Sequence, residues 1–310
     1  MSVAVNTAAR RHVVVLGGTG FVGRRLVAQL LRDGHRLTVL SRGGDPAKRA
    51  LLPRDSSLIE GDVHDPDFLR AVLDDADAVV NLIGILNERG DAGDGFERVY
   101  VTQLESLIAA MKDMGVRRLL QMSALGAGSG DSHYLQSRGR AEQRVRESGL
   151  DWTLFRPSVI AGPGDGLFCR FDQLLRFAPV LPIGRADARF QPVWVGDVVQ
   201  AYARALADGG SIGQRYDLVG PDVLSLADIV RLTARARGRL RAVIPLPEAL
   251  GRLQAGIGEH LPGKPISRDN WRSLQTDSVS DDNGLPKLGI AATPVPPRLR
   301  EILGLEPSRD

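Results

Sequence analysis

Short apolar runs alternate with segments of helical periodicity in the first half of the chain. The run His12–Leu16 stops at two glycines, which is typical of a buried strand in a parallel sheet. The segment Phe21–Asp33 then repeats apolar residues at helical spacing, and Gly34 ends it. The same alternation predicts further strands at Leu37–Leu40, Ser57–Glu60, Ala78–Ile83, Arg118–Met122 and Trp152–Arg156, with helices at Gly95–Met114 and Tyr134–Ser148.

This order of elements predicts an α/β fold with a parallel sheet and right-handed crossovers. We expect residues 11–157 to be a Rossmann-type, doubly wound, NAD(P)-binding domain. After Pro157 the pattern loosens, and helices are expected near Val195–Leu206, Leu224–Ala234 and Pro247–Ile257. Residues 158–310 are therefore expected to form a smaller C-terminal α/β lobe for substrate or partner, with some elements returning to the sheet.

Composition narrows the range of partners. Lys and Arg number 40 and Asp and Glu 37, which leaves a net charge of +3. The arginines are scattered and aromatic residues make up 5%, so the basic, aromatic stripe of a nucleic-acid-binding protein is missing. The single cysteine, Cys169, excludes an intramolecular disulfide, and the five histidines show no metal-ligand spacing. We expect neither a nucleic-acid partner nor a metal site.

The apolar segments also bear on location. The start, Met1–Arg11, lacks the apolar run of a signal peptide, and no stretch approaches the roughly 20 apolar residues of a membrane span. We expect a cytoplasmic protein without a transmembrane segment, and peripheral contact with the inner membrane stays open.

A glycine-rich loop between the first strand and the first helix carries the first candidate chemistry. Gly17, Gly20 and Gly23 have the spacing G-x-x-G-x-x-G, and glycines let the backbone approach a pyrophosphate closely. The helix that follows points free N–H groups and a positive dipole end at the phosphates. The loop therefore predicts a dinucleotide site, and its other expected cofactor-binding residues are Thr19, Phe21 and Val22.

The end of the second strand bears on which dinucleotide binds. NAD-binding sites usually carry an acidic residue there, whereas Leu40 is followed by Ser41 and Arg42. A guanidinium suits a 2′-phosphate, so we expect Ser41 and Arg42 to favour NADP(H) over NAD(H). Arg24 and Arg25 either add positive charge nearby or are solvated, and for Arg25 the solvated position is favoured.

The next two strand ends supply further cofactor contacts. Asp62 and Val63 follow the third strand, where the Asp62 carboxylate is placed to accept the adenine amino group. Leu82, Ile83 and Gly84 follow the fourth strand and are expected along the adenosine and nicotinamide riboses. A plain surface turn is the alternative for Asp62.

Together these features resemble the short-chain dehydrogenase/reductase superfamily, in its extended or atypical branch. The glycine loop Gly17–Gly23, the pair Asp62-Val63, Ser123 after the fifth strand, Tyr134, Arg156-Pro157 and the downstream run Val193–Val199 match its pattern in order. The resemblance covers nearly the whole chain, and it implies that Pro157 lies beside the cofactor.

Three stretches resemble a narrower group, the accessory NAD(P)H-binding subunit of respiratory complex I and its free-standing bacterial relatives. They are Met122–Ala127, Trp152–Asp165 and Leu261–Trp271, the last continuing through Leu274–Asp277. The resemblance implies that the dinucleotide is held rather than turned over, and it links the chain to ubiquinone metabolism. The implied partners are a dinucleotide, a quinone and a respiratory-complex subunit.

The same resemblance defines what an active member would need. It uses a Tyr as general acid/base, a Lys four residues later that lowers the phenol pKa and binds the ribose, a Ser that positions the carbonyl, and an Asn. Tyr134 and Ser123 are in place, but Arg138 stands at the Lys position and Tyr100 at the Asn position. Tyr134 and Arg138 are thus candidates both for catalysis and for lining the ribose.

Two main interpretations of function follow, beside a third in which the protein only supplies an interaction surface. The first is an NADP(H)-holding accessory or sensor protein linked to complex I or ubiquinone. The second is an active NADP-dependent reductase or epimerase acting on a quinone, a small carbonyl or a sugar nucleotide.

Two further groups of residues in the second half are candidates for contacts between the lobes or with a ligand or partner. Trp194 and Asp197 are expected to join the two lobes. A group of apolar residues is expected in core packing, with a pocket or face for a quinone or a partner protein as the alternative. The members of this group are Phe168, Phe171, Leu174, Leu175 and Phe177.

Overall fold

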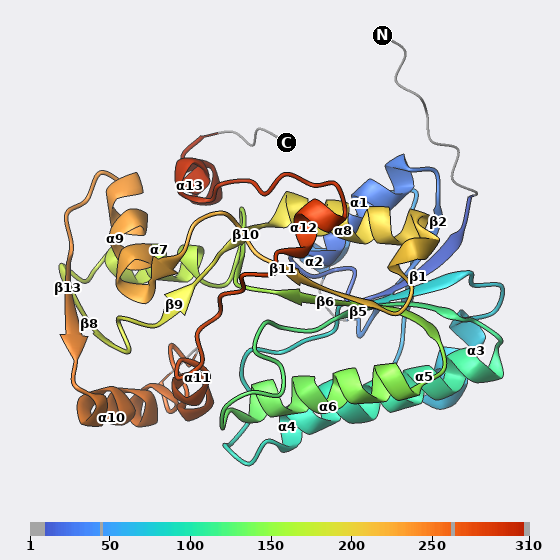
Figure 1. Cartoon of the computed structure of the whole chain (residues 1–310), viewed down its shortest axis with the longest axis horizontal. Helices are drawn as coiled ribbons and strands as arrows, with labels where there is room; N and C mark the ends of the chain where they lie inside the picture. The colour runs from blue at the N-terminus through green and yellow to red at the C-terminus, as the bar shows by residue number, and fades with distance from the viewer. Residues whose placement is uncertain (1–9, 44–45, 262–263, 307–310) are drawn as a thin grey trace, which may run out of the picture.

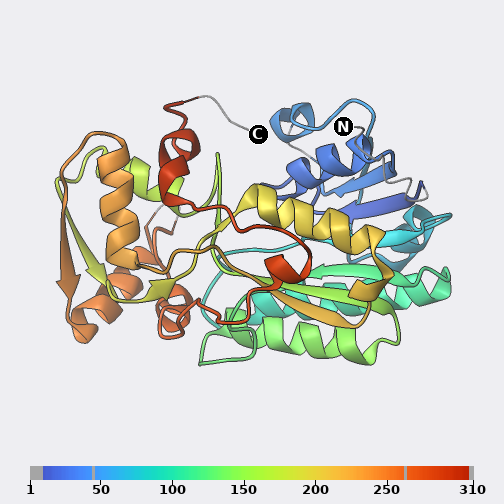
Figure 2. The ribbon, with the colours of Figure 1, turned by 45° about the horizontal axis from the view of Figure 1, so that its top comes forward.

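The computed structural model describes residues 10–43, 46–261 and 264–306, and it contains one large parallel sheet (Figures 1 and 2). Most of Met1–Arg11, and the Pro262-Gly263 part of the stretch Leu261–Trp271, lie outside the described residues. The seven strands run in the order β11-β6-β5-β4-β1-β2-β3, and every neighbouring pair is parallel. Their bounds are β1 His12–Leu16, β2 Arg36–Ser41, β3 Ser57–Glu60, β4 Ala78–Asn81, β5 Arg118–Met122, β6 Asp151–Pro157 and β11 Gln214–Leu218.

This sheet confirms the expected Rossmann-type fold. The chain moves outward from β1 through β2 to β3, then returns to β4 and moves outward on the other side. The order reverses between β1 and β4, and a crevice outside the carboxyl ends of two such strands is where α/β sheets bind ligands. β11, from the second half of the chain, extends the sheet beside β6.

Helices cover both faces of the sheet, so its central strands β1, β4 and β5 are buried along their whole length (Figure 1). One face carries α1 Gly23–Arg32 and α8 Val195–Ala207, which pack on one buried cluster. The opposite face carries α3 Pro66–Val72, α4 Asp94–Glu97, α5 Gln103–Asp113 and α6 His133–Glu147.

Two elements differ from the bounds that the sequence predicts. The strand expected to reach Ile83 ends at Asn81, whose side-chain oxygen accepts a hydrogen bond from the Ile83 amide at 3.2 Å. The single helix expected over Gly95–Met114 consists of α4, a π-helical turn at Arg98–Thr102, and α5. A π-turn inserts one residue per turn and changes which side chains face the sheet.

The second half also forms a separate layer at one end of the molecule (Figures 1 and 2). A parallel ribbon of β8 Val180–Gly184 and β13 Ala242–Leu246 packs with α7 and α9 around a smaller buried cluster. Its helices are α7 Phe168–Leu175, α9 Leu226–Ala236, α10 Glu248–Gly258 and α11 Arg268–Ser273. The remaining elements are α2 Pro46–Ala50, β7 Ile160–Ala161, β9 Arg189–Phe190, β10 Val193–Trp194, β12 Leu224–Ser225, α12 Gly284–Lys287 and α13 Leu299–Ile302, with 3-10 turns at Gly209–Ser211 and Pro296–Arg298.

Candidate functional site

The glycine loop lies at the carboxyl end of β1, where its backbone is too crowded for side chains. Gly17 has a φ of +77°, and a Cβ there would lie 3.0 Å from the Leu82 backbone. A Cβ on Gly23 would lie 2.3 Å from the Gly17 carbonyl oxygen. Only glycine therefore lets the first turn of α1 press against the loop, which brings the amides of that turn to the position where phosphates bind.

The loop is also tied to the second half of the chain. Arg25 donates hydrogen bonds to the carbonyl oxygens of Phe21 at 2.9 Å and Pro163 at 2.7 Å, and Arg24 reaches the same Pro163 oxygen at 3.3 Å. The Arg25 guanidinium lies 4.9 Å from the Phe21 ring centroid. The expectation that Arg25 is a plain solvated residue is wrong, because it joins α1 to the segment after β7.

Ser41 and Arg42 stand at the carboxyl end of β2, and the Arg42 side chain is exposed. Ser41 is paired in register with Glu60, the last residue of β3. The Glu60 carboxylate lies close to the following turn, since a Cβ on Gly43 would be 2.9 Å from its Oε2. The cation of Arg42 and the carboxylate of Glu60 thus lie at the neighbouring ends of β2 and β3, and the sequence pattern had indicated only Arg42.

The residues after β3 and β4 line the same edge of the sheet. Asp62 is exposed, and its Oδ1 accepts a hydrogen bond from the His64 amide at 2.9 Å, whereas Val63 is buried. Leu82 and Ile83 are half-buried. Gly84, also on this edge, is exposed, so the predicted cofactor residues of four strand ends are contiguous.

Tyr134 and Arg138 lie on α6 one turn apart, against the segment that follows β4. The Arg138 guanidinium stacks 3.8 Å from the Tyr100 ring centroid and 5.5 Å from that of Tyr134, and its Nη1 donates to the Met122 carbonyl at 2.8 Å. A Cβ on Gly84 would lie 3.1 Å from Nη2. The absent side chain at Gly84 therefore leaves room for this cation beside the segment after β4.

Arg138 is buried, and its Nε has no hydrogen-bond partner among the described residues. Burial disfavours the charged form, but the phenols of Tyr100 and Tyr134 outweigh it and raise the pKa of Arg138 above its ordinary value. A buried donor without a partner is costly, which is consistent with a site that accepts a ligand oxygen.

Tyr100 fixes the backbone of the segment after β4 by two hydrogen bonds. Its phenol donates to the Ile85 carbonyl and accepts from the Ile85 amide at 2.7 Å. Burial raises the pKa of Tyr100 to about 12. The phenol keeps its proton at neutral pH and uses it on the backbone, so Tyr100 does not replace the proton-relaying Asn in chemical terms.

Ser123 belongs to a buried polar network. Its hydroxyl donates to Glu142 Oε1 at 2.7 Å, and Glu142 is only 1% exposed. Glu142 also accepts from Arg156 at 2.6 and 2.7 Å and from Arg146 at 2.6 Å. The hydroxyl proton of Ser123 is thus bonded to a carboxylate oxygen. Pro157, next to Arg156, is buried at the end of β6, and its carbonyl oxygen accepts a hydrogen bond from the Leu125 amide at 3.0 Å.

Helix α11 fixes the start of α6. The buried carboxylate of Asp269 accepts hydrogen bonds from the amides of His133 at 2.7 Å and Tyr134 at 3.1 Å, and from the Ser132 hydroxyl at 3.0 Å. Arg272, on the same helix, forms a bidentate ion pair with Asp91 at 2.6 and 2.8 Å, which holds the pKa of Asp91 below its usual range. Sequence reasoning had noticed this segment only as part of a resemblance.

Comparisons with known proteins agree with this geometry. A family model described as NAD(P)H-binding matches residues 17–170. The chain is 31% identical to the mitochondrial NADH dehydrogenase (ubiquinone) 1 alpha subcomplex subunit 9 of Arabidopsis thaliana over 87% of this chain and 71% of that relative. The chain belongs to this NAD(P)H-binding, short-chain dehydrogenase/reductase-like family.

A second sequence relative and a solved structure with the same fold are named for other activities. The ceramide reductase of Caulobacter vibrioides is 30% identical over 81% of this chain and 78% of its own length. The structure of UDP-glucose 4-epimerase from Thermotoga maritima with UDP-glucose superimposes with a TM-score of 0.73 over 94% of this chain and 97% of that chain, at 16% identity. The epimerase likeness shows the fold alone.

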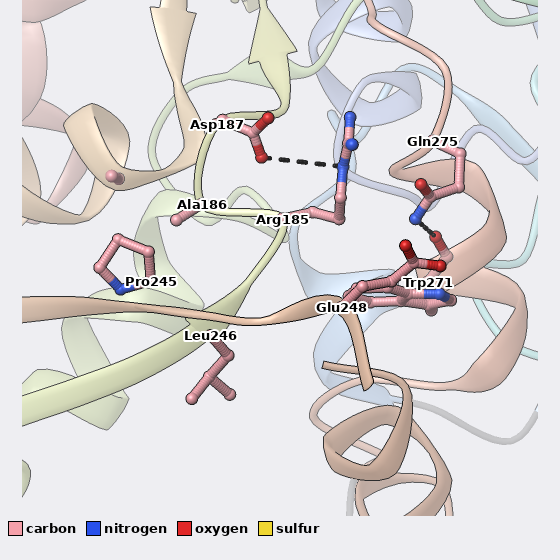
Figure 3. Close-up of a pocket in the computed structure, with 9 residues that line it drawn as sticks. Arg185, Ala186, Asp187, Pro245, Leu246, Glu248, Trp271 and Gln275 are labelled. Carbon is pink, nitrogen blue, oxygen red and sulfur yellow. Dashed lines mark hydrogen bonds and ion pairs between the residues drawn. The ribbon is translucent and has the colours of Figure 1, made fainter. Parts of the chain in front are cut away.

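A hollow of about 410 Å³ lies in the C-terminal half of this family member (Figure 3). Arg185 and Asp187 lie on one side of it, 3.8 Å apart, and Glu248 and Trp271 on another. Gln275 donates to the Trp271 carbonyl at 3.1 Å. None of the residues predicted from the sequence to bind cofactor or to act in catalysis lines this hollow.

The apolar group of the second half divides into two. Phe168 and Leu175 are buried in two different clusters and Phe171 packs against both, whereas Leu174 and Phe177 are exposed. Core packing therefore explains only part of the group.

Trp194 and Asp197 lie at contacts with the C-terminal segment. Trp194 is buried beneath the Arg298 guanidinium, 3.8 Å from its ring centroid. Asp197 accepts from the amide and the hydroxyl of Thr293 at 2.7 and 2.8 Å. Both residues thus contact the C-terminal segment, and Trp194 also packs in a buried cluster with Ala161, Phe168 and Ile229.

Two absences concern the described residues alone. Within the described ranges, no group of three or more His, Cys, Asp or Glu side chains is arranged to hold a metal ion. Among the helices of the described chain, none has the length and apolar character needed to cross a bilayer.

Proposed function

We propose that this protein holds NADP(H) as a resident cofactor, in an accessory or sensing role linked to a respiratory complex or to quinone metabolism. The hydrogen bond from Ser123 to Glu142 is the observation that carries this proposal. A catalytic serine has to offer its hydroxyl proton to a substrate carbonyl, and here that proton is engaged with a buried carboxylate. The complex I subunit relative supports the same role.

The cofactor side of the proposal rests on residues that agree with one another. Gly17 and Gly23 support a pyrophosphate site, Arg138 lies beside Gly84 on the segment expected to follow the riboses, and Arg42 is exposed where a 2′-phosphate is expected. We expect NADP(H) to be preferred over NAD(H) on account of Arg42. Residues 11–157 form the cofactor domain in this proposal, and residues 158–310 form the lobe that faces substrate or partner.

Ligand analysis of the purified protein tests the proposal directly. Mass spectrometry of the material released from freshly purified protein should detect NADPH or NADP⁺. The bound NADPH should stay reduced when ubiquinone analogues, aldehydes, ceramide precursors and sugar nucleotides are added in turn. Rapid oxidation of the bound cofactor by any of these compounds would contradict the resident-cofactor role.

An active NADP-dependent reductase is the second candidate, and the position of Tyr134 favours it. Tyr134 is half-buried rather than sealed, and it lies beside Arg138 at the carboxyl end of the sheet. The relative named ceramide reductase makes a lipid carbonyl the first substrate class to test. Tyr134→Phe should abolish any turnover found while leaving the dissociation constant for NADPH nearly unchanged. Turnover that survives this change would exclude Tyr134 as the acid.

The cellular setting is part of the same proposal. We expect the protein in the cytoplasm, at the periphery of the inner membrane, where a quinone and a respiratory-complex subunit are both present. Co-purification with respiratory-complex subunits from solubilised membranes tests this setting, and recovery only in the cytosolic fraction would contradict it.

A further inference from the structure

Helix α10 packs with its small residues toward the protein. A Cβ on Gly251 would lie 2.4 Å from the Trp271 ring, and one on Gly258 would lie 2.6 Å from the Ile266 side chain. Ala255, between them on the same face, is buried. The helix can sit this close to α11 only because that face has almost no side chains.

The large apolar residues of α10 consequently face outward. Leu250, Leu253 and Ile257 are 49%, 58% and 55% exposed. The spacing i, i+3, i+7 places them on one side of the helix. An amphipathic surface helix normally turns such a stripe toward the core, so α10 is inverted relative to that pattern.

Exposed apolar residues continue on the neighbouring ribbon and loops. Ile244, on β13, is exposed in register with Pro182 of β8. The loops that lead into the two strands carry Phe177 and Leu240, which are 89% and 88% exposed. Arg241 Nε donates to the Leu175 carbonyl at 3.1 Å, so these two loops lie side by side.

These residues occupy one end of the molecule. Both views place α10 and β13 at the end opposite to β2 and α3 (Figures 1 and 2). We call this surface the end face and define it by Phe177, Leu240, Ile244, Leu250, Leu253 and Ile257. Scattered single apolar residues on a surface need no explanation, but six exposed apolar residues on neighbouring elements at one end of the molecule mark a candidate interaction site.

The segment that carries most of the end face is rich in cations, although three of them pair with carboxylates: Arg237 with Asp172, Arg252 with Glu248 and Arg268 with Glu259. Residues 235–268 contain seven Arg or Lys residues and two Glu residues, a net charge of +5. The whole chain has a net charge of +3, so the remaining residues together carry −2. A partner with an apolar interior and an anionic surface would complement both the exposed apolar residues and the basic residues of this segment.

We propose that the end face is the surface by which this protein binds an anionic lipid bilayer. An amphipathic helix with an outward apolar stripe lies in the plane of the bilayer interface, with its basic neighbours at the level of the headgroups. The two neighbouring loop tips with Phe177 and Leu240, at the opposite end of the β8–β13 ribbon from α10, form a second point of insertion. Arginine stems cover apolar surface while their guanidinium groups stay at the headgroups.

The charge distribution argues against a second copy as the occupant. Two end faces in contact would bring two segments of net charge +5 together, which costs free energy in a dimer and favours an anionic surface. The inference rests on the peripheral-membrane setting of the proposed function, but the end face shares no residue with the predicted dinucleotide site, so loss of vesicle binding and loss of NADPH binding are distinguishable.

Vesicle flotation of the full chain tests the proposal. The probes are vesicles of phosphatidylcholine alone and vesicles with about one third phosphatidylglycerol. We expect binding to the anionic vesicles that weakens when salt rises from about 0.1 to 0.5 M, because screening shortens the reach of surface charge. The double variant Leu253→Gln with Ile257→Gln should reduce the bound fraction about tenfold or more.

The matched control is Leu51→Gln, because Leu51 is 55% exposed and lies just after α2, outside the end face. This control should bind vesicles like the wild type. Unchanged NADPH binding and an unchanged unfolding midpoint in the double variant would show that it is folded, since the altered residues are exposed. Three results would overturn the proposal: no binding to anionic vesicles, equal binding by the double variant, or a wild-type dimer that the double variant abolishes.

Discussion

The carboxylate of Asp269 accepts a hydrogen bond from the backbone amide of Tyr134 at 3.1 Å. Asp269 lies on α11 in the C-terminal half, and Tyr134 lies in the first turn of α6, beside the expected nicotinamide. A carboxylate at a helix N-terminus satisfies free amides and interacts favourably with the helix dipole. The orientation of Tyr134 and Arg138 therefore depends on a segment that is 135 residues away along the chain.

Removing this carboxylate should destabilise the protein and loosen the site. We expect Asp269→Ala to lower the free energy of unfolding by about 2 kcal/mol, because buried amides lose their acceptor. Asp269→Asn should cost about half as much, because the amide oxygen still accepts a hydrogen bond. Urea denaturation measures the stability change, and fluorescence titration should show weaker NADPH binding in the alanine variant.

The matched control is Asp65→Ala at the start of α3. Asp65 also caps a helix, accepting from the Asp67 amide at 2.9 Å, but it is exposed and lies on the turn between β3 and α3. It should lose about 1 kcal/mol of stability with no change in NADPH affinity. Equal effects of the two alanine variants on affinity would contradict a positioning role for Asp269.

Gly23→Ala should weaken both the fold and dinucleotide binding. Its Cβ would lie 2.3 Å from the Gly17 oxygen, so α1 has to move away from the loop, at a cost of about 1–3 kcal/mol. That shift removes the amides from the phosphates, and we expect about tenfold or greater loss of NADPH affinity. Gly209→Ala serves as the control because its Cβ would meet nothing within 4 Å, and it should bind normally.

Tyr100→Phe should produce a pH-dependent loss of stability. At neutral pH the lost bonds to Ile85 cost about 1–3 kcal/mol. The pKa of Tyr100 is about 12 in the folded protein and ordinarily 10, so the folded state holds the proton more tightly. The wild type therefore loses stability as pH rises from 10 toward 12, by up to about 1.4 kcal/mol per pH unit, whereas the variant lacks this contribution.

Urea unfolding at about pH 8 and pH 11 measures this difference. We expect the gap between wild type and Tyr100→Phe to be about 1 kcal/mol smaller at the higher pH. A constant gap would mean that the buried phenol does not hold its proton as the structure implies.

The parts of the fold that could be predicted are those encoded locally. The apolar runs of β1 and β4 and the glycine spacing of the first turn depend on neighbouring residues, and parallel sheets bury both faces of each strand. The expected cofactor residues after β1, β2, β3 and β4 meet at one edge because the carboxyl ends of parallel strands do so.

The parts that escaped prediction depend on contacts between distant segments. Glu142 meets Ser123 across 19 residues, and Asp269 reaches Tyr134 only after the second half folds back. The inversion of α10 was hidden because periodicity gives an apolar stripe without saying which way it faces. Trp271 decides this direction, since only the glycine face of the helix fits against its ring.

Arg42 and Glu60 carry opposite charges, so we expect them to have opposite effects on the affinity for NADPH. Arg42 should pair with a 2′-phosphate, so Arg42→Ala should weaken NADPH binding about tenfold and leave NADH binding unchanged. Glu60, in register with Ser41, repels the same phosphate, and Glu60→Gln should strengthen NADPH binding about two- to fivefold. Arg49→Ala, in the exposed helix α2, is the control and should change neither affinity. Isothermal titration with both dinucleotides measures these changes, and a loss of NADH affinity equal to that of NADPH in Arg42→Ala would show that Arg42 does not read the 2′-phosphate.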